Sequence, residues 1–206
     1  MTSAPAFRRA EPDARRADLV AACARVLARA GAGGTSVRAI ALEAGVSPGL
    51  VGHYFASIDA LVAATYAHVG GQVDAALEAA VAAAGPDPRA QLEAFVTASF
   101  APPIADAQLL ATWIAFWSLC RARPDMAALH DTQYAAYRAR TEGLLRACGM
   151  APQDLRRAAI AMTALVDGLW LELCLSPGCF TPEEAGEIAR AQIAALLGAA
   201  LTSPDR

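Results

Sequence analysis

The chain has 206 residues, of which 56% are hydrophobic and 6% aromatic, and its 17 basic residues are all Arg against 20 acidic residues. A chain this apolar can bury a substantial core, which excludes wholesale disorder. Its longest charge-free runs, 107–120 and 191–204, are shorter than the roughly 20 apolar residues that a membrane-spanning helix needs. No membrane partner is therefore expected.

The formal net charge of −3 hides an uneven distribution of charge. Residues 1–57 hold seven Arg and four acidic residues, whereas residues 58–206 hold ten Arg and sixteen acidic residues. The N-terminal segment is thus basic although the whole chain is acidic, and a basic segment suits nucleic acid. A flexible basic arm could be formed by Arg8, Arg9, Arg15 and Arg16.

Helix signals follow one another along the whole chain, and strand signals are scarce. Asp87-Pro88 places a capping oxygen before a proline at the first helical position, and Thr181 with Glu184 has the spacing of a capping box. We predict an all-α fold of about nine helices, three short ones in a first domain (1–57) and longer ones in a second (58–206). The expected helices are 13–30, 37–44, 48–54, 58–84, 88–101, 105–122, 125–148, 153–175 and 182–201.

The segment SVRAIALEAGVSPGLVGHYF, residues 36–55, has the pattern of a helix-turn-helix. Apolar residues recur from Val37 at the spacing of one helix face, and Gly45 can take the positive φ that a tight turn requires. Ser47 is expected to cap the second helix, with Val51 on its buried side. In a helix-turn-helix this second helix enters the major groove of DNA. An ordinary helical hairpin is the alternative.

The opposite side of this second helix carries small, apolar or hydroxyl-bearing side chains. Such side chains suit close approach to a groove, contact with thymine methyl groups and hydrogen bonds to phosphate. Arg38, on the preceding helix, is a candidate for a guanine or phosphate contact, and a solvated surface charge is the alternative. The candidate DNA-binding residues are Ser36, Arg38, Ser47, Pro48, Gly49, Leu50, Gly52, His53 and Tyr54.

The longer segment VRAIALEAGVSPGLVGHYFASIDALVAA resembles the DNA-binding segment of the TetR family of one-component repressors. The segments TWIAFW and ALVDGLWL are further similar, in order and spacing, to the BetI-type, choline-responsive members. The resemblance implies an all-helical homodimer with two DNA-binding heads on a palindromic double-stranded operator. It also implies a larger body that binds a small-molecule effector and then releases the DNA.

Two positions depart from the family pattern. Gly52 stands where many members carry Tyr, and Ile58 stands where most carry a Lys that commonly contacts phosphate. Loss of one phosphate contact should weaken affinity for the DNA backbone and lower the salt dependence by about one charge.

Aromatic residues gather on three successive helices of the second domain. One helix carries three of them at i, i+3 and i+4, the next carries a tyrosine pair, and the third carries a Trp one turn after an Asp. Such a cluster could cage a quaternary ammonium through cation–π contacts of about 0.5–2 kcal/mol each. An ordinary aromatic core is the alternative. The candidate effector-binding residues are Trp113, Phe116, Trp117, Tyr134, Tyr137, Asp167 and Trp170.

The last two predicted helices are apolar enough to form the contact between two subunits, which the resemblance places there as a four-helix bundle. A two-fold dimer would set two recognition helices about one DNA turn apart, or a multiple of it. The residues expected at this contact are Val166, Leu169, Leu173, Ile193, Leu196 and Leu197.

The preferred interpretation is a cytoplasmic, ligand-responsive repressor with neither cofactor nor metal. One alternative is a TetR-type regulator of an efflux or catabolic operon with an unrelated hydrophobic effector. A helical-bundle enzyme would be expected to show a Glu-x-x-His pair, a nucleophile beside a His, or a glycine-rich phosphate loop, and we find none of these patterns. A partner-binding helical protein would not need the helix-turn-helix pattern.

Overall fold

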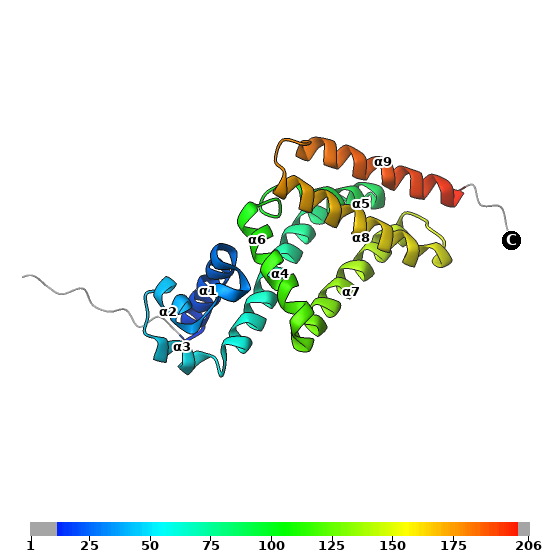
Figure 1. Cartoon of the computed structure of the whole chain (residues 1–206). Coiled ribbons are helices and arrows are strands. Elements are labelled where there is room, and N and C mark those ends of the chain that lie inside the picture. Colours follow the sequence, from blue (N-terminus) through cyan, green and yellow to red (C-terminus); the bar gives the residue numbers. More distant parts are fainter. Residues whose placement is uncertain (1–11, 202–206) are drawn as a thin grey trace, which may run out of the picture.

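A computed structural model describes residues 12–201, which contain helices and connecting loops but no strand (Figure 1). The all-α prediction is therefore confirmed for this part of the chain. In chain order the helices are α1 (Pro12–Gly34), α2 (Val37–Glu43), α3 (Pro48–Tyr54), α4 (Ile58–Ala83), α5 (Pro88–Thr97), the short 3-10 helix η1 (Ala98–Phe100), α6 (Ala107–Ala122), α7 (Pro124–Ala147), α8 (Pro152–Leu175) and α9 (Pro182–Leu201).

Helices α1, α2 and α3 form a small unit at one end of the molecule (Figure 1). The Ser36 hydroxyl caps α2 by accepting a hydrogen bond of 3.2 Å from the Ala39 amide. Gly45 then turns the chain with a φ of 65°, a conformation that glycine adopts without steric cost. Ile40 and Val51 point into the core between the helices, each at most 2% exposed. The cap, the glycine turn and the two buried side chains together hold α3 against α2.

The long helix α4 leads from this unit into the body of the molecule, where α8 and α9 lie at the far end (Figure 1). Helix α6 packs against α1 on one side and against α7 on the other, and α4 packs against α1, α5 and α7. Two body helices therefore contact the N-terminal unit directly.

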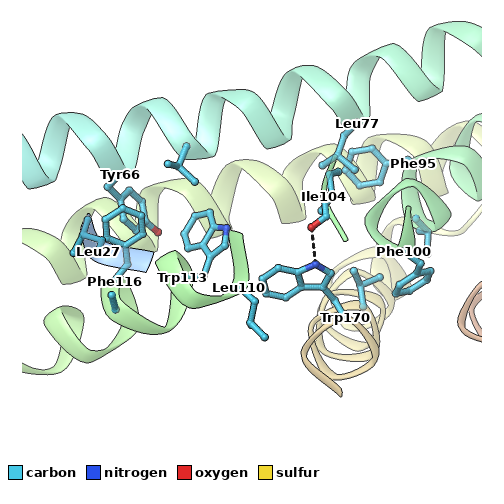
Figure 2. Close-up of a cluster of buried hydrophobic side chains, with 14 of the residues drawn as sticks. Leu27, Tyr66, Leu77, Phe95, Phe100, Ile104, Leu110, Trp113, Phe116 and Trp170 are labelled. Atoms are coloured by element: carbon cyan, nitrogen blue, oxygen red, sulfur yellow. Dashed lines mark hydrogen bonds between the residues drawn. The ribbon is translucent and has the colours of Figure 1, made fainter. Parts of the chain in front are cut away.

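The core of the body is built around interlocking aromatic rings (Figure 2). The Tyr66 ring meets the Trp113 ring edge to face at 5.2 Å between centroids and the Phe116 ring at 4.9 Å. The Trp170 indole N–H donates a 2.9 Å hydrogen bond to the Ile104 carbonyl, which ties α8 to the loop before α6 (Figure 2).

The predicted helix bounds differ from the structure where a cap decides the end. Helix α6 begins at 107 and not at 105, because the Asp106 carboxylate accepts a hydrogen bond from the Leu109 amide. The helix expected at 88–101 ends earlier, at Thr97, and continues as η1. Ser47 occupies the N-cap position of α3, but its side chain makes no capping hydrogen bond, contrary to expectation.

The expected basic arm is only partly testable, because Arg8 and Arg9 lie outside the described residues. Arg15 and Arg16 are not an arm, because both belong to α1. Arg15 pairs with Asp18 one turn along the same helix. Arg16 instead reaches the end of α3, where it contacts Tyr54.

Candidate functional site

The body contains a cavity of about 90 Å³ enclosed by α4, α6, α7 and α8. Its aromatic lining residues come from α6, α7 and α8. The cavity contains six of the seven residues that the sequence singled out as an effector cage: Trp113, Trp117, Tyr134, Tyr137, Asp167 and Trp170.

The three indoles form a connected wall. The Trp113 and Trp117 centroids are 6.5 Å apart, and the Trp117 and Trp170 rings meet edge to face at 6.4 Å. The hydrogen bond from Trp170 to Ile104 fixes the orientation of the third indole. Phe116 does not line the cavity, because its ring is fully buried behind Trp113. Phe116 therefore supports the wall and cannot contact a ligand directly.

The charge of the cavity is negative. Asp167 and Asp74 line it, and no Arg or Lys is among the described residues of its wall. Burial raises the pKa of Asp167 to about 6, although interaction with the Tyr134 hydroxyl and the charge of Arg138 act in the opposite direction. Burial also raises the pKa of Asp74, with a smaller contribution from Glu78. Two carboxylates that lose hydration in an aromatic enclosure favour a cation.

The sequence did not identify the rest of the wall. Helix α4 contributes an apolar strip and one carboxylate, and the loop before α6 closes one end. Val166 was expected at the subunit contact, and the other residues were interpreted only as parts of helices and loops. Helix α4 has no aromatic cluster to draw attention to this stretch. The additional lining residues are Val73, Asp74, Leu77, Ser99, Ile104, Gln133 and Val166.

The candidate DNA-binding residues lie in α3, in the turn before it and at the start of α2. Leu50 and Tyr54 are half-buried and the other seven are exposed, including Arg38. Most of these residues are therefore accessible to a partner. Ile58 is half-buried and packs against the core at the start of α4.

One side chain of α1 contacts the C-terminal end of α3. The Arg16 guanidinium donates a 3.1 Å hydrogen bond to the Tyr54 carbonyl at the last residue of α3. The same guanidinium lies 4.2 Å from the centroid of the Phe55 ring. Glu43 links α2 to α1 in turn, because its carboxylate accepts hydrogen bonds from Arg25 and Arg29 of α1.

Comparison with known families matches both parts of the chain. A model described as bacterial regulatory proteins of the tetR family matches residues 19–65. A model described as the C-terminal part of BetI-type transcriptional repressors matches residues 88–198, more than half of the chain. The chain belongs to the TetR family of transcriptional repressors. Its body is of the BetI type.

Relatives of this TetR-family repressor cover almost its whole length. The HTH-type transcriptional regulator BetI of Burkholderia thailandensis is 37% identical over 184 residues, which are 89% of this chain and 93% of that protein. A transcriptional regulator from Pseudomonas aeruginosa has 41% identity and a TM-score of 0.86, covering 94% of this chain and 95% of that one. A regulator from Saccharomonospora viridis, crystallised in complex with choline, shares the fold at a TM-score of 0.69 and 20% identity, over 88% of this chain and 96% of that one.

Members of the TetR family act as dimers, and this repressor has an exposed apolar stripe on α8 and α9. Ile160 and Leu175 of α8 are 44% and 58% exposed, and Ile188 of α9 is 46% exposed. Small residues continue the stripe between them: Ala161, Ala164 and Gly168 on α8, and Ala191 and Ala195 on α9. Three residues expected at the subunit contact are instead buried inside the protomer: Val166, Leu173 and Ile193.

Helix α8 is apolar on its buried side as well as on this exposed stripe. Over 18 of its residues the mean hydropathy is 1.7. By length and composition alone α8 could therefore cross a membrane, as could the core helices of many soluble proteins. In this structure α8 packs against α7 and α9 and carries Asp167 in its middle. One such helix is weak evidence for a membrane span.

Proposed function

We propose that this repressor responds to a small quaternary ammonium, choline or a close relative, that binds in the cavity of the body. The observation that carries the proposal is the composition of the wall: three Trp, two Tyr and two Asp, with no basic residue among the described lining residues. Aromatic faces attract a cation through their ring quadrupoles, and the attraction grows when water is excluded. The choline complex from Saccharomonospora viridis supports the proposal, since a protein of the same fold holds this ligand.

The size and charge of the cavity also bear on the alternative effector. Drug-sized ligands occupy roughly 300–1,000 Å³, whereas this cavity measures about 90 Å³. A neutral hydrophobic effector would desolvate the Asp167 carboxylate further without adding a positive charge beside it, which is unfavourable. Both features favour a compact cation over a hydrophobic drug-like effector.

For the DNA complex we propose that residues 1–57 act as the DNA-binding domain and residues 58–206 as the effector-binding and dimerisation domain. The exposed face of α3 would enter the major groove, with Arg38 beside it at a phosphate or guanine. A two-fold dimer through the α8 and α9 stripe presents two such faces to a palindromic operator. Binding of operator DNA in this way implies a cytoplasmic protein.

Two helices connect the cavity to the DNA-binding domain. Helix α6 carries Trp113 and Trp117 and packs on α1, and α4 carries Asp74 and begins directly after α3. A ligand shifts an equilibrium only by its difference in affinity for two conformations. We therefore propose that choline binds most tightly to a conformation in which α4 and α6 are displaced from the positions that they have in the DNA complex. This displacement changes the separation of the two recognition helices.

The test compares choline with 3,3-dimethylbutan-1-ol, which has the same shape but no charge. We expect choline to bind in calorimetry, to raise the melting temperature and to release operator DNA, because only the cation gains cation–π and carboxylate contacts. The neutral analogue should bind at least tenfold more weakly. Trp117→Ala should weaken choline binding by a similar factor without unfolding the protein, since Trp117 is only half-buried.

Equal affinity for choline and its neutral analogue would contradict the ammonium cage while leaving the repressor function intact. In that case a hydrophobic effector would become the better hypothesis.

The DNA-binding face is tested with Arg38→Ala and Tyr54→Ala in a gel-shift assay on the DNA upstream of the gene. Each should weaken operator binding, by about 1–3 kcal/mol if the residue contacts a base. Arg157→Ala is the control, because Arg157 is an exposed Arg on α8 in the body. Unchanged affinity in both head variants would show that α3 is not the recognition helix.

A further inference from the structure

Beside the effector cavity lies a second hollow, on the outer side of the Tyr134 and Asp167 pair. The hollow runs between α7 and α8, and Tyr134 and Asp167 line both it and the cavity. The two spaces therefore meet at one tyrosine and one aspartate. Whatever binds in the cavity lies next to this outer hollow.

The outer hollow differs from the cavity because it adds basic groups. The cavity offers aromatic rings and carboxylates, whereas the hollow offers the guanidinium groups of Arg138 on α7 and Arg156 on α8 beside the carboxylates of Glu142 and Asp167. Arg138 is one helical turn from Tyr134, which places it about 6 Å further along the α7 axis. Its charge reaches the cavity, because it acts on Asp167 to lower the pKa of that carboxyl.

Neither arginine forms a salt bridge among the residues that the structure describes, and Arg138 acts on Asp167 only through its charge. The contrast with Arg140, two positions from Arg138 on α7, is direct: Arg140 holds both carboxylate oxygens of Glu78, at 2.6 and 2.8 Å. Glu142 lines the hollow beside Arg138 and Arg156 yet forms no salt bridge with either of them. Two unpaired guanidinium groups facing one hollow provide forked donors that match the geometry of a carboxylate or phosphate.

We propose that the effector is a zwitterion, with its quaternary ammonium in the aromatic cavity and an anionic group, a carboxylate, on Arg138 and Arg156 in the outer hollow. The proposal rests on the ammonium site described above and specifies the class of ligand that fills it. The cation balances Asp167, and the anion balances the two arginines. In this ligand a spacer of about 6 Å joins the two charged ends. Tyr134 and Asp167 flank the spacer.

The test uses three ligands that share a trimethylammonium group. The first is 4-(trimethylammonio)butanoate, whose carboxylate is three methylenes from the nitrogen; the second is its methyl ester, which has a neutral end; the third is choline. Affinities are measured by calorimetry at pH 8 on the full-length protein. We expect the carboxylate to bind at least tenfold more tightly than its ester.

Variants then assign this preference to the hollow. In Arg138→Gln the affinities for the carboxylate ligand and for its ester should lie within about threefold of each other. In Arg156→Gln the preference for the carboxylate ligand should become smaller. Choline affinity should stay within about threefold in both variants, which also reports that the cavity is intact. Arg157→Gln is the matched control, because Arg157 adjoins Arg156 in sequence but does not line the hollow, and it should keep the full preference.

Three outcomes overturn the proposal, and they are distinguishable. If choline and the ester bind but the carboxylate binds no better, the zwitterion is wrong and the ammonium site stands. If the preference survives Arg138→Gln and Arg156→Gln together, the anionic group binds elsewhere. If none of the three ligands binds, the ammonium site itself is wrong and the zwitterion falls with it.

Discussion

At the scale of single residues, we expect Asp167 to make effector binding depend on pH. Its pKa of about 6 lies inside the range in which the protein can be studied, and a quaternary ammonium has no proton of its own to lose. We expect choline to bind about tenfold more weakly at pH 5 than at pH 8, because only about a tenth of the carboxylate is ionised one pH unit below its pKa. Calorimetry at the two pH values measures this ratio.

Asp167→Asn is the control for that ratio. The variant should bind choline weakly at both pH values and lose most of the pH dependence, leaving only the contribution of Asp74. A wild-type affinity that is the same at pH 5 and pH 8 would show that Asp167 does not contact the cation.

The same carboxyl has the opposite effect on the stability of the ligand-free protein. Its pKa is higher in the fold than in the unfolded chain, so the native state holds the proton more tightly and its ionised form costs stability above pH 6. This cost disappears as the pH falls below about 4. We expect Asp167→Asn to be more stable than wild type by about 1–3 kcal/mol at pH 8 and nearly equal to it below pH 4, measured by urea unfolding. An equal difference at both pH values would contradict this.

At the scale of elements, the position of α3 depends on a residue of α1 that the sequence had placed in a flexible arm. Arg16→Ala removes the hydrogen bond to the Tyr54 carbonyl and the cation–π contact with Phe55. We expect a loss of about 1–2 kcal/mol in the free energy of unfolding and weaker operator binding, because the recognition helix is less well oriented. Arg15→Ala is the control, since it removes an Arg of α1 that forms its salt bridge with Asp18 on the same helix. Equal effects of the two substitutions on operator binding would mean that net charge, and not the orientation of α3, matters.

Helices whose ends have local signals were predictable, and surfaces set by tertiary packing were not. Both hydrogen bonds of the expected capping box of α9 are present. The Thr181 amide donates to the Glu184 carboxylate, and the Glu184 amide donates to the Thr181 hydroxyl. Phe116, by contrast, shares a helical face with Trp113, and only the three-dimensional packing shows that Trp113 lines the cavity and Phe116 does not. Asp74 carries no local pattern that could have marked it.

The subunit contact shows the same limit, because α8 and α9 are apolar on two sides. Val166 and Ile160 are both β-branched residues of α8, yet the first faces the core and the second faces solvent. Composition predicts that such a helix is buried on both sides, but it does not say which side faces the protomer. That assignment needs the positions of α5 and α7.

At the scale of the whole molecule, dimerisation and DNA binding should fail together. Replacing Leu175 and Ile188 with Arg places charge on the exposed stripe, where it would be desolvated in a dimer. We expect the double variant to run as a monomer in light scattering, to keep its helical content, and to lose at least 100-fold in operator affinity. Leu42→Arg is the control for dimerisation, because Leu42 is 84% exposed on α2. A variant that remains dimeric would place the interface elsewhere.

The three tryptophans of the chain are Trp113, Trp117 and Trp170, and all three line one cavity. The ultraviolet emission of the protein therefore comes from indoles at this single place, with none in the DNA-binding head. A change in emission on adding a ligand would report occupancy of the cavity directly, without an attached dye. Binding of DNA at the head would change the emission only if the conformation of the body changes with it, so the native fluorescence can follow the communication between the two sites.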